Sequence, residues 1–325
     1  MIDKRTVFVL GAGASCPYGY PSGAQLRKRI CLDFDGKYLI YLDARNKAGV
    51  GGVWDLYEPH QVNEFTSKFF KSSKKSIDVY LAANPQSAAI GKYIIAFEIF
   101  DAEKSSNFRE HAVEGQDWLS YLFNRLTEDF TTPDRLPDFS DGNMGFISFN
   151  YDRSLEYFLY ESLRNSFTEV PEEKILLCLK DLRIIHVYGK TAPLEWEGGD
   201  YTKYVPKNID ETLLRKAAGS IWTIYERQES PELREAHELL HRAERIFFLG
   251  FGYAPENMKV LNLPESIPIG CKVYGSAFNM EPMEVEHIRD TVHSGRKRDR
   301  PNGFMSPGYT IVEPCDCLML LRRYL

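Results

Sequence analysis

Residues 6–15, TVFVLGAGAS, decide the fold of this chain. The first five, TVFVL, form a short apolar run rich in β-branched and aromatic side chains, which is typical of a buried β-strand. Gly11 and Gly13 follow at once, and glycine directly after such a run indicates a tight turn. The segment therefore predicts a strand over residues 6–10, a glycine turn, and then a helix over residues 22–32.

Five further strand-like runs follow, and helical patterns separate most of them. The runs cover residues 145–149, 183–188, 245–249, 272–274 and 310–312. Continuous apolar strands that alternate with helices are typical of a parallel sheet covered on both faces. The sequence therefore predicts an α/β fold built on a doubly wound parallel sheet, in which a ligand binds beyond the carboxyl ends of the strands.

The long segment between the first two strands has a different character. Residues 34–76 are polar, aromatic and interrupted by glycine, and helical patterns return at residues 86–100 and 116–130. We expect a single domain over residues 1–325 that is enlarged by a mainly helical insertion at about residues 33–130.

Composition excludes several classes of protein. Of the 325 residues, 43% are hydrophobic and 26% charged, which excludes wholesale disorder. No uncharged apolar run approaches the roughly 18–20 residues of a membrane helix, and the N-terminus lacks the apolar stretch of a signal peptide. The net charge of −6 gives no global reason to bind nucleic acid or anionic membranes. Six irregularly spaced cysteines indicate a reducing compartment, so we expect a globular cytoplasmic protein.

The first segment that follows a strand is GAGAS, residues 11–15. Glycine at this place lets backbone N–H groups approach a pyrophosphate, and the N-terminus of the next helix adds a favourable dipole. The usual dinucleotide fingerprint GxGxxG is incomplete, because Cys16 stands in place of its third glycine. The alternative interpretation is a plain tight turn.

Two other segments place polar side chains after a strand. Asn150 and Asp152 follow the run at residues 145–149, where the alternative is helix capping. His186 lies near the end of the next run, where the alternative is a histidine satisfied within the core. The Gly-Lys-Thr that follows it mimics the end of a phosphate-binding P-loop, but Ile184 stands where that motif requires its first glycine. A P-loop is therefore excluded.

The segment HELLH matches the HExxH motif of zinc hydrolases. On a helix, His237 and His241 would share one face, with Glu238 as the base. A charged surface helix rich in Glu and His gives the same pattern, and no metzincin extension follows. We therefore expect a solvated helix face and no metal.

Cysteine and basic residues near the C-terminus carry weaker signals. Cys315 and Cys317 have no second pair to accompany them, which argues against a structural zinc module. The basic cluster at residues 296–300 is interpreted as a solvated loop.

Together, these motifs resemble the Sir2 (sirtuin-like) superfamily. The segment GAGASCPYGYP is similar to the family's GAGxSxxxGxP loop, and the matching positions are Gly11, Ala12, Gly13, Ser15, Gly19 and Pro21. Asn150 and Asp152 match the family's N-x-D, and Gly189 matches the glycine of its histidine–glycine motif. Such matches imply a Rossmann-like core that binds NAD and cleaves its nicotinamide–ribose bond.

Two further segments extend the resemblance. Gly250-Phe251-Gly252-Tyr253 is similar to the family's later nucleotide loop, and Ser76-Ile77-Asp78 looks like a segment common in bacterial Sir2-like proteins. The matches occur in family order across roughly residues 6–280.

Departures from the family pattern indicate which branch the chain resembles. Protein deacylases carry a zinc-binding four-cysteine insert and an Asp-Phe-Arg run after the first proline. Here Pro21 is followed by Ser-Gly-Ala, and the cysteine pairs are absent. The chain therefore resembles bacterial Sir2-like effectors that hydrolyse NAD, many of which serve anti-phage defence by depleting it.

One departure concerns the catalytic base. The family's histidine directly precedes the glycine, and Tyr188 occupies that position here, with His186 two residues earlier. On a strand, residues i and i+2 point to the same face about 6.6 Å apart, so His186 would reach the same cavity. Imidazole titrates near neutral pH whereas a phenol does not, so we favour His186.

The resemblance implies an NAD glycohydrolase that yields nicotinamide and ADP-ribose, with NAD as substrate. Asn150 would orient the ribose and a water, and His186 would act as general base. Asp152 would contact the nicotinamide amide. The backbone amides from Gly11 to Ser15 would hold the pyrophosphate. Gly250 and Gly252 would line the adenosine side.

Three other functions stay open. A non-catalytic NAD or ADP-ribose sensor is suggested by Tyr188 in place of histidine. A protein deacylase is disfavoured by the missing cysteines, and a zinc hydrolase would use HELLH. About 45 residues follow position 280 and carry no obvious sensor domain, so a separate partner protein or a homo-oligomer would supply activation, by analogy with the family.

Overall fold

The computed structural model describes residues 4–49, 57–105, 117–130, 132, 135–224, 226, 230–294 and 309–325. Its strands are β1 (Thr6–Leu10), β2 (Met144–Ser148), β3 (Arg183–His186), β4 (Arg245–Leu249), β5 (Lys272–Ser276) and β6 (Thr310–Glu313). Its α-helices are α1 (Gly23–Lys28), α2 (Phe34–Lys47), α3 (Pro59–Lys71), α4 (Ile77–Ala83), α5 (Ala88–Ser105), α6 (Trp118–Thr127), α7 (Ser154–Ser166), α8 (Glu172–Asp181), α9 (Glu211–Ser220), α10 (Pro231–Arg242), α11 (Pro255–Val260), α12 (Pro282–Ser294) and α13 (Cys317–Tyr324).

The strands form one parallel sheet in the order β3-β2-β1-β4-β5-β6. Its centre is β1, whose five residues are all buried. The Phe8 ring stacks on Phe146 of β2 at 5.1 Å and on Phe247 of β4 at 5.4 Å, measured between ring centroids. This strand order is that of Rossmann-type folds, so the prediction of a doubly wound Rossmann-like sheet is confirmed.

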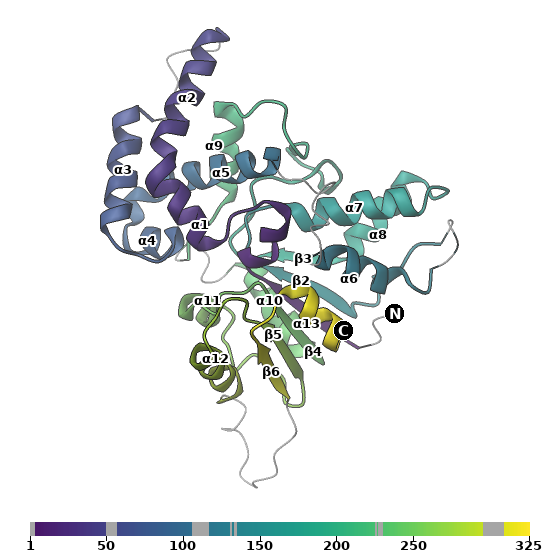
Figure 1. The fold of residues 1–325 in the computed structure, drawn as a ribbon. Coiled ribbons are helices and arrows are strands. Elements are labelled where there is room, and N and C mark those ends of the chain that lie inside the picture. The colour runs from purple at the N-terminus through teal and green to yellow at the C-terminus, as the bar shows by residue number, and fades with distance from the viewer. Residues whose placement is uncertain are drawn as a thin grey trace.

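Helices cover both faces of the sheet (Figure 1). On one side, α13 packs on β5 and against α6. Leu239 of α10 lies against Gly145 of β2, where a Cβ atom would stand 2.9 Å from a leucine methyl group. Glycine at this position therefore lets the helix approach the strand closely.

A separate helical layer stands above the sheet in Figure 1 and contains α2, α3, α4, α5 and α9. Its central helix is α5, which packs along α9. The Tyr93 hydroxyl of α5 donates a 3.0 Å hydrogen bond to Glu211 of α9. The part of the predicted insertion from α2 to α5 therefore packs together with α9, a helix from the connection between β3 and β4, whereas α6 packs against α13 and α7.

Helix starts follow capping chemistry that is readable in the sequence. Ser22 accepts a hydrogen bond from the Gln25 amide, and the Gln25 side chain accepts one from the Ser22 amide, which forms a capping box at α1. Ser230 caps α10 in front of Pro231. Outside the insertion, the helices α8, α11 and α13 were not predicted from sequence.

The third strand is shorter than its sequence pattern predicts. It ends at His186, because the Gly189 amide donates to the His186 carbonyl and closes a turn. Gly189 has a φ of +71°, a conformation that favours glycine. The expected strand over residues 183–188 is therefore wrong for its last two residues.

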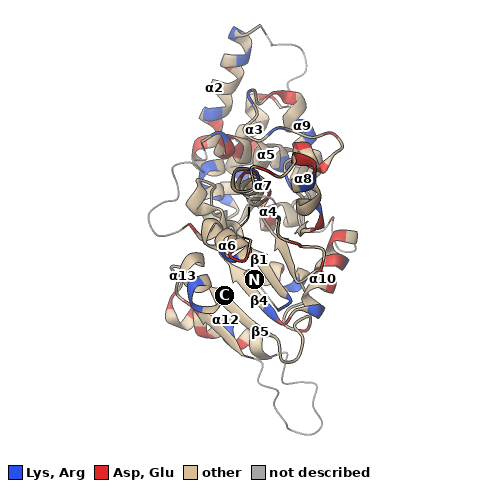
Figure 2. Ribbon diagram, turned by 90° about the vertical axis from the view of Figure 1, so that its right-hand side faces the viewer, with Lys and Arg blue, Asp and Glu red and all other residues tan. Residues whose placement is uncertain are grey.

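Two surface properties bear on the sequence-based exclusions. Acidic and basic residues are mixed along the helices (Figure 2), as the modest net charge of −6 leads one to expect. Within the described ranges, no helix is both long and apolar enough to cross a membrane.

Candidate functional site

The loops after β1 and β4 meet at the point where the strand order reverses. In doubly wound sheets this topological switch point is where ligands bind. The Gly11 amide donates to the Leu249 carbonyl at 3.0 Å, and the Gly13 amide donates to the Gly250 carbonyl at 3.1 Å. The GAGAS segment and the GFGY segment are therefore joined directly through their backbones.

Glycine is required on both sides of this contact. A Cβ atom on Gly13 would lie 2.8 Å from the Gly250 oxygen, and one on Gly250 would lie 2.0 Å from the Ala14 nitrogen. Gly250 also has a φ of +56°. These glycines thus allow two backbones to touch, a role that differs from the phosphate contact expected from the sequence.

Most amides of the GAGAS segment already have partners. The N–H groups of Gly11, Gly13, Ala14 and Ser15 all donate to backbone carbonyls. Trp118 of α6 donates from its indole nitrogen to the Ala14 carbonyl at 2.8 Å and fixes the segment from outside. A pyrophosphate would therefore have to replace some of these bonds in order to be held by the amides.

Asn150 lies directly beside this segment. Its Nδ2 atom donates to the Gly11 carbonyl at 3.1 Å and lies 3.0 Å from the Ser15 hydroxyl. Because the Gly11 carbonyl can only accept, the amide orientation is fixed and Oδ1 points away from it. The Oδ1 atom is buried and finds no hydrogen-bond partner among the described residues.

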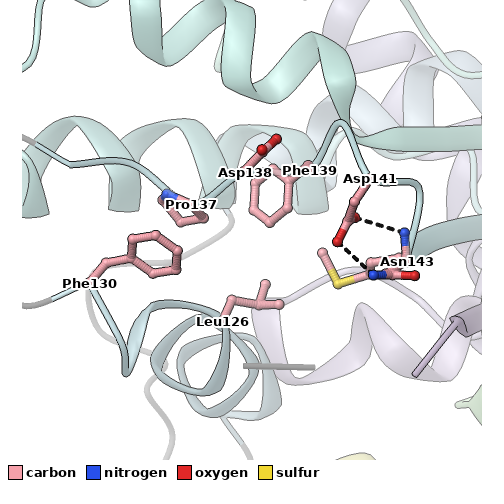
Figure 3. A pocket seen from close by; sticks show the side chains of 8 residues that line it. Leu126, Phe130, Pro137, Asp138, Phe139, Asp141 and Asn143 are labelled. Carbon is pink, nitrogen blue, oxygen red and sulfur yellow. Dashed lines mark hydrogen bonds between the residues drawn. The ribbon is translucent and has the colours of Figure 1, made fainter. Parts of the chain in front are cut away.

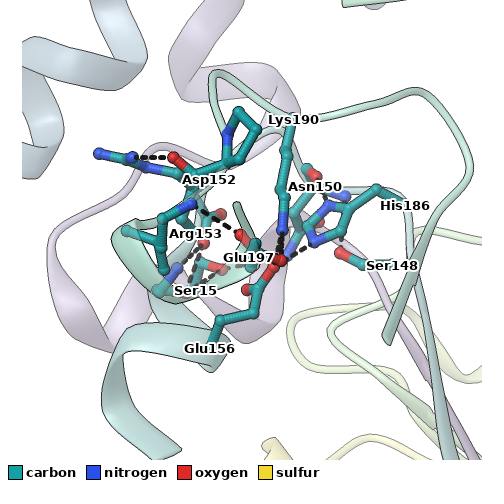
Figure 4. A network of polar contacts seen from close by, with 12 residues as sticks. Ser15, Ser148, Asn150, Asp152, Arg153, Glu156, His186, Lys190 and Glu197 are labelled. Carbon is teal, nitrogen blue, oxygen red and sulfur yellow. Dashed lines mark hydrogen bonds and ion pairs between the residues drawn. The ribbon is translucent and has the colours of Figure 1, made fainter. Parts of the chain in front are cut away.

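Asp152 is buried two residues further on and caps the start of α7 (Figure 4). It accepts hydrogen bonds from the amide and the hydroxyl of Ser154. Burial raises the pKa of the Asp152 carboxyl above its usual range, although the hydrogen bonds from Ser154 and Ser15 oppose this shift. The capping alternative therefore describes part of what this residue does.

His186 is held by two oxygen atoms. Its Nδ1 atom lies 2.9 Å from the backbone carbonyl of Asn150, and its Nε2 atom lies 2.8 Å from Oε1 of Glu156 (Figure 4). Only 8% of the histidine surface is exposed. The structure thus brings Asn150 and His186 into direct contact at the ends of neighbouring strands.

Glu156 was not identified from the sequence. It lies in the first turn of α7, where the helix dipole favours a carboxylate. Lys190 contacts it at 2.7 Å and also contacts Glu197 at 2.6 Å. Burial opposes the charged carboxylate, but Lys190 and His186 outweigh it and hold the pKa of Glu156 well below its usual range.

Lys190 stays charged for the same reason. Burial alone would lower its pKa, but Glu156 and Glu197 raise the pKa of Lys190 above its ordinary value. The sequence offered one sign of these two residues, which is their spacing from predicted site residues: Glu156 lies four residues after Asp152, and Lys190 lies four residues after His186. That signal acquires meaning only when the fold places the two segments side by side.

A small cavity connects these side chains. Its volume of about 10 Å³ has room for a single water molecule. Its polar lining consists of Ser15, Ser148, Asn150, Asp152, Ser154, Glu156 and His186. Seven residues chosen from sequence therefore meet here or at the adjoining glycine contact: Gly11, Gly13, Ser15, Asn150, Asp152, His186 and Gly250.

Tyr188 points elsewhere. Its hydroxyl donates to Asn257 of α11 at 2.9 Å, and its ring packs edge-on against Phe149. The expectation that His186 and Tyr188 share one cavity is therefore wrong, because the strand turns between them.

A much larger groove opens next to the GFGY segment. Its volume is about 1250 Å³, above the range typical of small-molecule sites. Its lining includes Lys74, Ser76, Gly252, Tyr253, Lys259, Met283 and His287. Gly252 therefore borders this groove rather than the small cavity.

Another cavity adjoins the amino end of β2, and Figure 3 shows the side chains that line it. Its volume is about 30 Å³, and it adjoins Met144 at the start of β2. Asp141 accepts hydrogen bonds there from the Asn143 amide at 2.9 Å and from the Asn143 side chain at 2.6 Å. Residues singled out as functional from the sequence do not line it.

The HELLH segment forms part of α10. His237 donates from Nε2 to the Val260 carbonyl at 2.9 Å, and His241 is exposed. No cluster of His, Cys, Asp and Glu suited to a metal ion occurs within the described part of the chain. Cys315 and Cys317 are free thiols, and the basic cluster at residues 296–300 lies outside the described residues.

No protein-family model matches this chain, and no curated protein matches it at a significant level.

Proposed function

We propose that this protein hydrolyses NAD to nicotinamide and ADP-ribose. The observation that carries the proposal is the buried Oδ1 atom of Asn150, which lacks a donor among the described residues and lines a cavity with His186. Buried polar atoms in proteins are almost always paired, so a free acceptor at the switch point marks a place for a ligand's hydroxyl or for water. Hydrolysis at a ribose carbon brings both to the site, because the ribose carries hydroxyl groups and the attacking molecule is water.

The reaction makes modest demands on the protein. Nicotinamide leaves as a neutral molecule from a cationic precursor, so its departure needs no general acid. The site must position a ribose with oxocarbenium character and deliver a water to it. Asn150 orients the ribose and the water, and His186 accepts a proton from the water or from a ribose hydroxyl.

The remaining contacts follow the order of the strands. Asp152 offers a carboxyl to the nicotinamide amide. Amides between Gly11 and Ser15 hold the pyrophosphate after they exchange the carbonyl partners that they have in the unliganded chain. Gly250 and Gly252 line the adenosine side, where the large groove begins.

Substrate entry requires movement. The small cavity holds one water and not a nicotinamide ring, so the segments after β1 and β2 and helix α6, which enclose it, have to move apart. We place this activity in bacterial anti-phage defence, in the cytoplasm, where a resting closed state protects the cell's own NAD. A partner protein or self-assembly into a homo-oligomer would open the site, and no metal is involved.

The direct test is incubation with NAD, with and without a candidate partner protein, while nicotinamide is measured. Asn150→Ala and His186→Ala should each lower the rate of its release by at least about 100-fold, whereas Asn165→Ala, an exposed position on α7, should not. Release at the unaltered rate in both site variants would contradict the proposal.

A second candidate is an NAD or ADP-ribose sensor without catalysis. The closed cavity and the two occupied nitrogens of His186 favour it. Tight NAD binding by calorimetry with no nicotinamide under any activating condition would establish the sensor. A deacylated acyl-peptide product in the presence of NAD would instead indicate a protein deacylase, and stoichiometric zinc that is lost in His241→Ala would indicate a zinc hydrolase.

A further inference from the structure

Glu156 has no part in the mechanism outlined above, yet it contacts the residue that is assigned as the base. Its exposed fraction is 4%, and a buried carboxylate is retained only where partners compensate for the lost water. Its Oε1 atom faces His186 at 2.8 Å and Lys190 at 2.7 Å. Its Oε2 atom is buried and has no hydrogen-bond partner among the described residues.

The hydrogen atoms on His186 follow from its two partners. The Asn150 carbonyl can only accept, so Nδ1 carries a hydrogen. Lys190 keeps Glu156 ionised, and an ionised carboxylate can also only accept, so Nε2 carries a hydrogen as well. The resting histidine is therefore an imidazolium ion held between two acceptors.

We infer that Glu156 is the positioning residue of His186 and that it makes Nδ1 the nitrogen that acts as base. This inference rests on the proposed hydrolysis of NAD. Glu156 occupies Nε2–H, so Nδ1 is the nitrogen that can exchange its present partner, the Asn150 carbonyl, for a substrate. A buried carboxylate plays the same part for histidine in hydrolase triads, where it selects the tautomer and stabilises the imidazolium.

The proton balance is complete without a further reactant. On substrate binding, Nδ1 gives its proton to solvent and leaves the Asn150 carbonyl. The attacking water then forms the bond to the ribose carbon while the carbon–nitrogen bond to nicotinamide breaks, and the electron pair of that bond neutralises the pyridinium ring. Nδ1 takes the proton of the water, and Glu156 stabilises the imidazolium that results.

Charged groups from each neighbouring segment act on the pair formed by Glu156 and His186. Glu156 comes from α7, Lys190 and Glu197 from the segment after β3, and Asp152 from the segment after β2. Trp118 and Leu119 cover the cavity from α6 without charge. Lys190 is therefore the group that keeps Glu156 ionised and available to the histidine.

The test compares Glu156→Gln with Glu161→Gln, a matched change on the same helix. In Glu156→Gln, kcat for nicotinamide release should fall about 10- to 100-fold, as for other partners that orient a functional histidine. KM for NAD should stay within about threefold, because the residue does not touch substrate. Glu161→Gln should match the unaltered protein, and circular dichroism checks that each variant is folded.

Nitrogen-15 NMR of the histidine ring gives a readout that needs no turnover, with signals assigned by their loss in His186→Ala. The unaltered protein should show slowly exchanging hydrogens on both nitrogens, and Glu156→Leu, which offers no acceptor, should lose the one on Nε2. Identical patterns in both proteins, or an unchanged kcat in an active Glu156→Gln variant, would overturn the inference. An unaltered protein that releases no nicotinamide would overturn the proposed function instead, while the NMR comparison still decides whether Glu156 controls His186.

Discussion

His186 and Asn150 are joined directly, because the Nδ1 atom of the histidine lies 2.9 Å from the backbone carbonyl oxygen of the asparagine. His186 ends β3, and Asn150 follows the end of β2 by two residues, with Ser148 of β2 in register with His186. The side chain of Asn150 meanwhile binds the Gly11 carbonyl, so one residue connects the ends of three strands. This geometry ties the two expected catalytic groups to the glycine loop.

His186 and Tyr188 should differ sharply as candidate bases. His186→Ala should lower kcat for nicotinamide release by about 10²–10⁴-fold, the usual contribution of a general base. Tyr188→Phe should change it little, because burial raises the pKa of Tyr188 far above its ordinary value and the phenol stays protonated. Steady-state kinetics on both variants checks this, and a greater loss in Tyr188→Phe would assign the base to tyrosine.

Close approach of the two glycine loops should make Gly250 intolerant of a side chain. Gly250→Ala places a Cβ atom 2.0 Å from the Ala14 nitrogen at a φ of +56°, and should lower the free energy of unfolding by at least about 2 kcal/mol. Gly252→Ala is the matched control, since no atom lies within 4 Å of its added Cβ. Urea denaturation of both variants measures the difference, and equal stabilities would refute the backbone contact.

Arg153 and Glu103 form a fully buried ion pair at 2.6 Å that joins α5 to the segment before α7. Arg153→Met should lower the free energy of unfolding by about 3–5 kcal/mol, because Glu103 loses the guanidinium that compensates for the burial of its carboxylate. Lys68→Met, which removes an exposed ion pair with Glu64 on α3, should leave stability unchanged within error. Thermal and urea unfolding measure the stabilities of both variants. Equal stabilities would show that the buried ion pair does not stabilise the fold.

The free energy of unfolding should fall at acidic pH because of Glu156. Its folded pKa lies below the ordinary value of 4.5, so the unfolded chain binds a proton that the native chain does not. The stabilisation is complete above pH 4.5 and is lost as the pH falls toward the folded pKa. Removing this carboxyl in Glu156→Gln should reduce the slope of unfolding free energy against pH below 4.5 by up to about 1.4 kcal/mol per pH unit.

Denaturation at several pH values between 3 and 6 measures that slope, and Glu161→Gln serves as the control because its carboxyl forms no ion pair with any residue that the structure describes. Parallel curves for Glu156→Gln and the unaltered protein would show that Glu156 is not held ionised in the native state.

The sequence alone was enough to predict the sheet and the segments that lie at its carboxyl edge. An apolar run such as TVFVL is typical of a strand that is buried on both faces, and glycine directly after it indicates a turn. Both features can be recognised from a short stretch of sequence. The same local rules failed at Tyr188, because the turn that ends β3 depends on the left-handed conformation of Gly189. They also gave no indication of the packing of α9 with the insertion.

Only the tertiary structure decided what the motif residues do in the unliganded chain. Asn150, His186 and Gly11 were chosen from three separate segments, but their mutual contacts depend on strand order, which no local pattern encodes. Glu156 and Lys190 are ordinary charged residues in the sequence and become a buried ion pair only because α7 and the segment after β3 converge. The sequence determines which side chains follow each strand. The fold determines which of them come into contact, because the energy of an interaction depends on the distance between its atoms in space and not on their separation along the chain.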